Sequence, residues 1–103
     1  MDKSEVLSVV SRFREALEAR GVRVEKVILF GSHASGTAQE GSDIDLVVVS
    51  RDFAGRPYWG RVETMAEAVA EVWEPIEAVG LTPEEWERGD SLVVEYARNG
   101  VSL

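Results

Sequence analysis

Apolar residues recur every three or four positions in two long stretches of the chain, residues 2–20 and 59–73. Polar and charged residues fill the positions between them, as on a helix that buries one face. Gly21 follows the first stretch, and Pro75 stops the second. Both stretches are therefore predicted to be amphipathic helices. The apolar positions are Val6, Val9, Val10, Phe13 and Leu17 in the first and Val62, Met65, Ala66, Val69 and Val72 in the second.

The C-terminal part of the chain predicts two shorter helices. Thr82 and Pro83 form a strong helix start, because threonine caps a first turn, proline suits its first position and Glu85 can complete a capping box. This helix is predicted to end near Gly89, and a last helix to cover residues 90–99.

β-branched and aromatic residues concentrate in three further segments, which we predict to be strands. They cover residues 24–30, 43–49 and 76–81, and residues 101–103 can add a short edge strand. Helices thus alternate with strands along the chain, which predicts a single α+β (layered α/β) domain over residues 1–103. We expect a small mixed sheet with helices packed chiefly on one face.

Composition excludes several classes of function. The 103 residues hold 11 basic and 19 acidic side chains, and the resulting net charge of -8 would repel a phosphate backbone, so nucleic-acid binding is not expected. An acidic chain can still bind a nucleotide when a metal ion supplies positive charge. With no cysteine and one histidine, the chain cannot build a zinc site. No apolar run approaches the roughly 20 residues of a membrane helix, and the N-terminus lacks a signal-peptide pattern, so a cytoplasmic protein is expected.

Two aspartates begin the second predicted strand. Asp43 and Asp45 are two positions apart, so on a strand their carboxylates point to the same face. Such a pair repels itself unless a cation lies between them, and Mg²⁺ prefers oxygen ligands, with substrate phosphates completing its shell. Glu77, on an otherwise apolar strand, is the best candidate for a third carboxylate, with Glu74 as its rival. A third carboxylate can complete a two-metal site for phosphoryl displacement or act as the general base for an attacking hydroxyl.

A second chemical signal follows the first predicted strand. Gly31 lets the backbone turn tightly and approach a ligand, and Ser32 can donate its hydroxyl to a phosphate. If residues 32–38 form a helical turn, its free N–H groups face the same phosphate. No Gly-Lys-Ser/Thr follows the glycines, which excludes a Walker-type phosphate loop, and their spacing does not fit a dinucleotide-binding fingerprint.

Together these residues resemble the signature of the DNA-polymerase-β-like nucleotidyltransferases, and in particular that of the minimal nucleotidyltransferases of bacteria and archaea. The resemblance spans nearly the whole chain and implies a nucleotidyltransferase fold. The third acidic position is usually aspartate in this family, whereas this chain has glutamate there. The matching residues are Gly31, Ser32, Ala34 and Gly36, followed by Ser42, Asp43, Ile44, Asp45 and Leu46. The roles that the resemblance implies are nucleotide binding for Gly31, Ser32 and Ser42, and catalysis and magnesium binding for Asp43, Asp45 and Glu77.

The resemblance implies two functions for one fold. As an enzyme, the chain would use Mg²⁺ to transfer a nucleoside monophosphate from a nucleoside triphosphate, ATP foremost, to a hydroxyl acceptor. Because the chain has no room for an acceptor-binding domain, a partner, a second copy or the acceptor protein itself would present that hydroxyl. As a binding module, it would be the antitoxin of a toxin–antitoxin system and neutralise a helical HEPN-type partner by forming a complex without turnover.

Four residues outside the signature also bear on function. His33 is predicted to be a solvent-exposed turn residue, with a phosphate contact as the alternative. Trp59, Trp73 and Trp86 are predicted to pack in the core or at its edge. The alternative is that one or two of them form an exposed patch for a partner chain.

Overall fold

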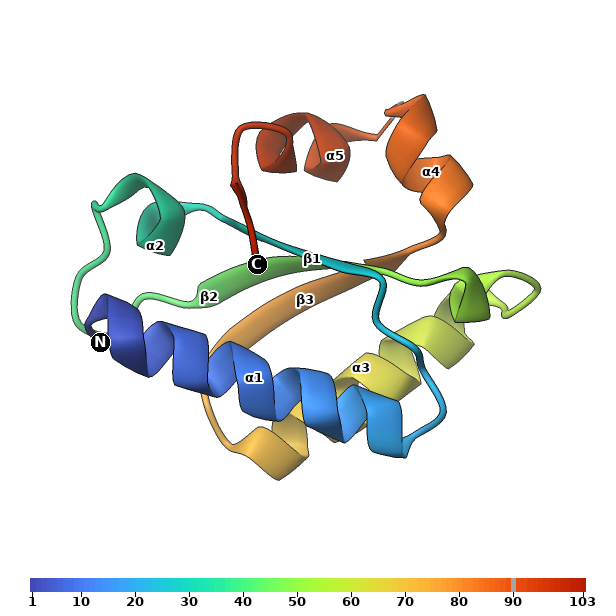
Figure 1. Cartoon of the computed structure of the whole chain (residues 1–103), viewed down its shortest axis with the longest axis horizontal. Helices are drawn as coiled ribbons and strands as arrows, with labels where there is room; N and C mark the ends of the chain where they lie inside the picture. The colour runs from blue at the N-terminus through green and yellow to red at the C-terminus, as the bar shows by residue number, and fades with distance from the viewer. Residues whose placement is uncertain (90) are drawn as a thin grey trace.

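Two long amphipathic helices and a four-stranded sheet form the framework of the fold (Figure 1). The computed structural model describes residues 1–89 and 91–103. The predicted helices and strands are confirmed to within a few residues at their ends, and the predicted start of the last helix at Asp90 lies outside the described residues. In chain order the elements are α1 (Lys3–Ala19), β1 (Lys26–Phe30), α2 (Ser32–Ser35), β2 (Ile44–Val49), the short 3-10 helix η1 (Arg51–Phe53), α3 (Tyr58–Val72), β3 (Ile76–Leu81), α4 (Pro83–Arg88), α5 (Leu92–Ala97) and β4 (Val101–Ser102).

Local capping explains where α1 and α4 begin. The Asp2 side chain accepts a hydrogen bond from the N–H of Glu5, and the Glu5 side chain accepts one from the N–H of Asp2. Thr82 and Glu85 form the same reciprocal pair at the start of α4, with Pro83 at the first helical position, as the sequence predicts. Each pair satisfies N–H groups that the first turn of a helix otherwise leaves without a partner.

The sheet is mixed, with the strand order β3-β2-β1-β4. β1 is antiparallel to both of its neighbours, whereas β2 and β3 are parallel because α3 carries the chain back between them. β3 and β4 are therefore the edge strands of the described sheet. None of the described helices combines the length and the apolar character that crossing a membrane requires.

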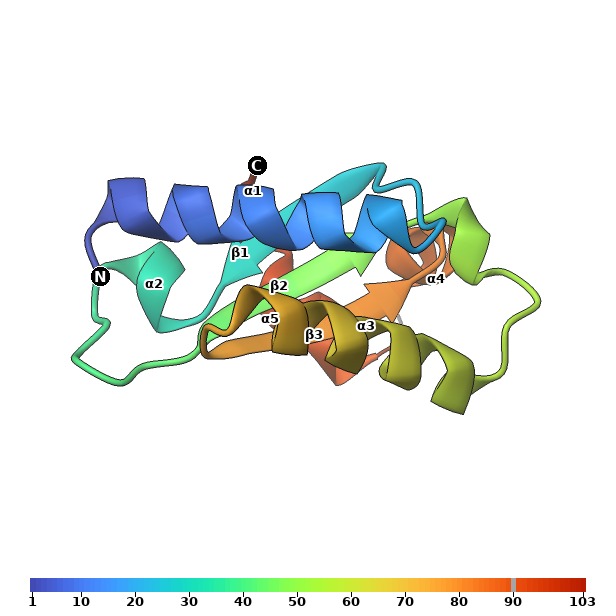
Figure 2. The same ribbon diagram turned by 90° about the horizontal axis from the view of Figure 1, so that it is seen from below.

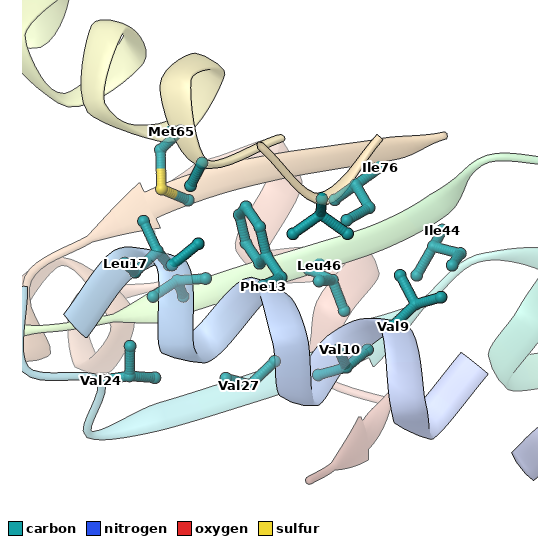
Figure 3. Close-up of a cluster of buried hydrophobic side chains, with 14 of the residues drawn as sticks. Val9, Val10, Phe13, Leu17, Val24, Val27, Ile44, Leu46, Met65 and Ile76 are labelled. Atoms are coloured by element: carbon teal, nitrogen blue, oxygen red, sulfur yellow. The ribbon is translucent and has the colours of Figure 1, made fainter. Parts of the chain in front are cut away.

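α1 and α3 lie side by side on one face of the sheet, as Figure 2 shows from that side. Their apolar stripes pack on the strand residues that point to this face, and the two layers enclose the larger of two hydrophobic clusters (Figure 3). The two long helices thus confirm the prediction of helices packed chiefly on one face. The labelled members of the cluster are Val9, Val10, Phe13, Leu17, Val24, Val27, Ile44, Leu46, Met65 and Ile76.

The opposite face of the sheet is covered over only part of its area. Val94 and Ala97 of α5 belong to the smaller cluster, which covers strand residues such as Val47. Glu77 and Val79 of β3, which alternate with the residues in the larger core, stay exposed. The beginning of β2 and β3 therefore remains open to a ligand on this face.

Two of the three tryptophans are not core residues, and the prediction that they pack in the core is wrong. The side chains of Trp59 and Trp73 are 74% and 86% exposed, whereas Trp86 is half-buried against the smaller cluster. Trp73 follows the last residue of α3 with a left-handed backbone (φ 59°), which turns its side chain away from the buried stripe. That conformation costs a non-glycine residue about 1–2 kcal/mol. Trp59 lies three positions before Val62, which is itself at the exposed border of the stripe.

Candidate functional site

Asp45 and Glu77 lie next to each other at the uncovered end of the sheet. They are register partners in the parallel pair of β2 and β3, and both alternate with residues that point into the larger core. Asp43 precedes β2 by one residue, outside the strand, and lies near enough for its charge to act on Asp45. Asp45 is half-buried, whereas Asp43 and Glu77 are exposed. The fold thus brings both of the other acidic residues that the sequence singles out near Asp45.

Gly31 packs directly against the Asp45 carboxylate. Phe30, the last residue of β1, is the register partner of Asp45 on the neighbouring strand, so the chain turns beside that carboxylate. The backbone of Gly31 has a φ of 74°, and a Cβ at this position would overlap Oδ2 of Asp45. Glycine is therefore required twice, by the backbone conformation and by the close approach to Asp45.

Burial and neighbouring acids raise the pKa of Asp45. The largest cause is the removal of its carboxylate from water, followed by hydrogen bonding with the Glu77 side chain and by the charges of Glu77 and Asp43. His33 acts in the opposite direction and lowers the pKa. Ionised Asp45 is therefore held in unfavourable surroundings, which a bound cation would relieve.

The donor atoms suit a hard divalent cation that brings part of its own shell. Within residues 1–89 and 91–103, no group of three His, Cys, Asp or Glu side chains is arranged to hold a metal by itself. Mg²⁺ commonly binds through one or two carboxylates and completes its shell with water and substrate phosphates. Asp45 with either acidic neighbour therefore fits a cation that arrives with a phosphate substrate.

Glu74, the rival third carboxylate, belongs to another part of the surface. Its Oε2 accepts a hydrogen bond from Nη2 of Arg12 on α1 at 3.3 Å. Glu77, by contrast, is the strand neighbour of Asp45. This placement favours Glu77 over Glu74 as the third acidic ligand.

The turn after β1 and the loop before β2 are tied together. Ser32 begins α2 directly after Gly31, and Nε2 of the next residue, His33, lies 3.2 Å from the carbonyl oxygen of Ser42. The hydroxyl of Ser42 accepts a hydrogen bond from the N–H of Gln39 at 2.9 Å and keeps its own proton for another acceptor. His33 is half-buried, so the prediction of a solvent-exposed turn residue is wrong. The contact joins α2 to the loop before β2, nine residues along the chain, and leaves no trace in the local pattern.

A hollow of about 520 Å³ adjoins this turn on the side of α5. Phe30, Gly31, Tyr96 and Asn99 are among its lining residues, and the Tyr96 side chain is 66% exposed. An aromatic ring can stack on a nucleobase and an amide can hydrogen-bond with its edge. Sequence reasoning did not identify Tyr96 or Asn99, because only the packing of α5 against β1 brings them to Gly31.

Comparisons with known proteins agree with this architecture. A family model described as a nucleotidyltransferase domain matches residues 10–95, which is most of the chain. A crystal structure from Sulfolobus solfataricus, which carries a provisional nucleotidyltransferase assignment, aligns with a TM-score of 0.60 and 21% identity over 99% of this chain and 87% of that chain. At this identity the likeness concerns the fold, and it confirms the predicted nucleotidyltransferase fold. None of the curated proteins matches the sequence significantly.

Proposed function

Because the chain belongs to the nucleotidyltransferase domain family, we propose that it transfers a nucleoside monophosphate from a nucleoside triphosphate, ATP foremost, to a hydroxyl acceptor with the help of Mg²⁺. The observation that carries the proposal is the pairing of Asp45 with Glu77, with Gly31 packed on the Asp45 carboxylate. Carboxylate oxygens of the kind that Mg²⁺ prefers thus lie beside a backbone turn that can approach a phosphate closely.

Each group of residues in the site has a separate role in the proposed reaction. Asp43, Asp45 and Glu77 are the candidate ligands: Asp45 with one of its two acidic neighbours would hold the cation, which would supply positive charge to the triphosphate. The turn at Gly31 and the Ser32 hydroxyl bind the phosphates. A carboxylate that is not engaged as a ligand accepts the proton of the acceptor hydroxyl. The acceptor oxygen then bonds to the α-phosphorus, the bond from that phosphorus to the bridging oxygen breaks, and pyrophosphate leaves.

We place the nucleoside in the hollow between α2 and α5. Gly31, in the turn that we assign to the phosphates, also lines the hollow. Phe30 lines the hollow too, and it is the register partner of Asp45 on the neighbouring strand. Its volume lies within the range of about 300–1,000 Å³ that is common for small-molecule sites. The exposed ring of Tyr96 is the group best suited to stack on the base.

Replacing Tyr96 with alanine is expected to weaken ATP binding about 10-fold, because stacking on an aromatic ring contributes roughly 1–3 kcal/mol per base. The Tm should stay nearly unchanged, since most of the side chain is exposed. Tyr96→Phe keeps the ring and should retain the affinity. Calorimetry with ATP and with inorganic triphosphate distinguishes a contact of the ring with the base from a contact with the phosphates. An equal loss of affinity for both ligands would place Tyr96 at the phosphates and contradict a base contact.

The enzyme proposal is tested by titrating ATP into the protein with Mg²⁺ and, separately, with a chelator. We expect calorimetry to show binding only in the presence of the cation. A second assay uses ATP that is labelled at the α-phosphate. It measures transfer of the label to small hydroxyl compounds and to protein acceptors, together with the release of pyrophosphate. If the protein binds no nucleotide under either condition, the transferase proposal is rejected and the binding-module proposal below gains support.

A second candidate function rests on a different observation, the exposure of Trp59 and Trp73. As the alternative, we propose an antitoxin-like binding module that neutralises a helical HEPN-type partner by complex formation without turnover. Replacing both Asp43 and Asp45 with asparagine distinguishes the two functions. Neutralisation that survives this double change requires only binding, whereas neutralisation that disappears requires the acidic site.

A further inference from the structure

An apolar groove runs along α3 beside the outer edge of β3. Two adjoining hollows of about 390 and 70 Å³ form it, and Val62, Met65 and Ala78 line both of them. α3 is the outer member of the helical pair, and β3 has no strand on its outer side among the described residues (Figure 2). Nothing in the described chain therefore continues the helical layer on this side.

An exposed tryptophan stands at each end of α3. Trp59 lies in the first turn, where its ring meets that of Tyr58 edge to face at 5.3 Å, and Trp73 directly follows the last turn. Trp73 holds a left-handed backbone that glycine adopts more easily, and its exposed side chain contributes little to the core. Neither backbone conformation nor folding explains a tryptophan there. Large exposed aromatic side chains are typical anchors of protein interfaces.

Acidic residues lie on the exposed surface of α3, and the charged residue among the described lining of the groove, Arg61, is already paired with Glu85 at 2.6 Å. Glu63 and Glu67 lie one turn apart on the exposed side of α3, and neither forms an ion pair with a described residue. Like charges at this spacing repel each other on an isolated helix. The net charge of -8 adds to this field and disfavours a second copy, a nucleic acid and an anionic membrane as occupants. Charge complementarity instead favours a basic protein.

We propose that the α3 groove binds a basic amphipathic helix of another protein. The 15 residues of α3 span about 22 Å, which matches a helix of similar length. A helix beside α3 extends the α1–α3 layer at the usual interaxial distance of about 8–10 Å. Its apolar stripe fills the groove between Trp59 and Trp73, and its lysine or arginine residues face Glu63 and Glu67. This interaction does not depend on the proposed transfer reaction; it rests on the binding-module alternative, whose exposed tryptophans it uses, and specifies the docking surface and the charge of the partner.

The probe is a synthetic helical peptide of about 15 residues, with leucine along one stripe and lysine on the remaining face. Its control has glutamate in place of every lysine. Binding is measured by calorimetry and by the tryptophan emission, which shifts to shorter wavelength as exposed indole rings are buried. We expect the lysine peptide to bind with a Kd on the order of 10 µM and the glutamate peptide not to bind.

Variants assign the binding to the groove. Trp73→Gly should lower the affinity for the lysine peptide at least about 10-fold. The same change should raise the Tm by about 4 °C, because glycine adopts the left-handed backbone more easily. Glu63→Gln with Glu67→Gln should weaken binding and flatten its salt dependence. The matched control is Leu92→Ala, an exposed apolar residue of α5, which should change nothing. Asp45→Asn should bind the peptide like the wild type, even if nucleotide binding is lost.

Four outcomes overturn the proposal. The first is the absence of lysine-peptide binding up to about 1 mM. The second is equal binding by the wild type and Trp73→Gly, and the third is equal binding of the two peptides. The fourth is self-association of the wild type that Trp73→Gly abolishes, because a second copy would then be the occupant of the groove.

Discussion

Replacing Asp45 with asparagine is expected to abolish magnesium-dependent nucleotide binding and transfer while making the metal-free protein more stable. Transfer should fall by about 10³-fold, because a catalytic metal contributes several kcal/mol of charge stabilisation to a phosphoryl transition state. The Tm at neutral pH, measured with a chelator, should rise by about 3 °C, since the neutral amide removes a carboxylate that burial, Glu77 and Asp43 disfavour. This modest value allows for the solvent that still reaches the half-buried side chain.

The pH dependence of this difference follows from the direction of the pKa shift. The folded state raises the pKa of Asp45 above its ordinary value of 3.8, so it binds a proton more readily than the unfolded chain does. The stability that protonation of Asp45 contributes to the folded state is present below pH 3.8 and is lost as the pH rises through the raised pKa. Scanning calorimetry of the wild type and Asp45→Asn should therefore show a Tm difference that is largest at neutral pH and shrinks in acid.

Two comparisons make this prediction specific. Mg²⁺ with ATP should raise the Tm of the wild type and leave that of Asp45→Asn unchanged, because ligands stabilise only the state that binds them. Glu74→Gln removes a carboxylate that pairs with Arg12 and should leave nucleotide binding unaltered. Nucleotide binding that persists in Asp45→Asn, or that disappears in Glu74→Gln, would show that the acidic site has been placed wrongly.

Gly31→Ala is expected to inactivate the protein at a small cost in stability. The added Cβ overlaps Oδ2 of Asp45, and the end of that side chain can rotate away more easily than the backbone can move. Rotation would carry the carboxylate out of the position in which it faces Glu77, so the proposed metal site would lose a ligand. We expect nucleotide affinity to fall at least about 10-fold, as for a displaced metal ligand, and the free energy of unfolding to fall by about 1–2 kcal/mol from the left-handed backbone.

Gly36 provides a matched control at the other end of α2. Its φ of 80° resembles that of Gly31, but a Cβ there would meet no atom within 4 Å. Gly36→Ala should therefore show a similar loss of unfolding free energy and retain nucleotide affinity. Urea denaturation and calorimetry measure the two quantities separately. If both variants lose affinity equally, the effect comes from the turn as a whole and not from the contact between Gly31 and Asp45.

Much of the fold could be predicted because it is encoded in short-range patterns. The helical repeat of Val6, Phe13 and Leu17 and the capping box at Thr82 depend on neighbours in sequence, so they determine α1 and the start of α4 before any tertiary contact forms. The position of Gly31 was likewise evident from its place after a buried strand. The reason for glycine there was only partly evident, since the overlap involves Asp45 on the next strand.

The candidate site was predicted less completely, because sequence spacing does not measure distance between strands. The choice between Glu74 and Glu77 depends on the register of β3 against β2 and on the hydrogen bond from Arg12. Tyr96 and Asn99 reach Gly31 only through the packing of α5. No spacing rule links a residue near the C-terminus to a turn after the first strand.

By itself, the sequence determined the order of helices and strands, the closeness of Asp43 to Asp45, and the glycine turn beside them. These features follow from periods of two and 3.6 residues and from local backbone preferences. Only the tertiary structure decided that Glu77 is the neighbour of Asp45 and that Trp73 lies outside the core. The physical reason is that burial and strand pairing depend on which segments meet in space, and a helix end such as that at Trp73 leaves the regular period on which sequence reasoning depends.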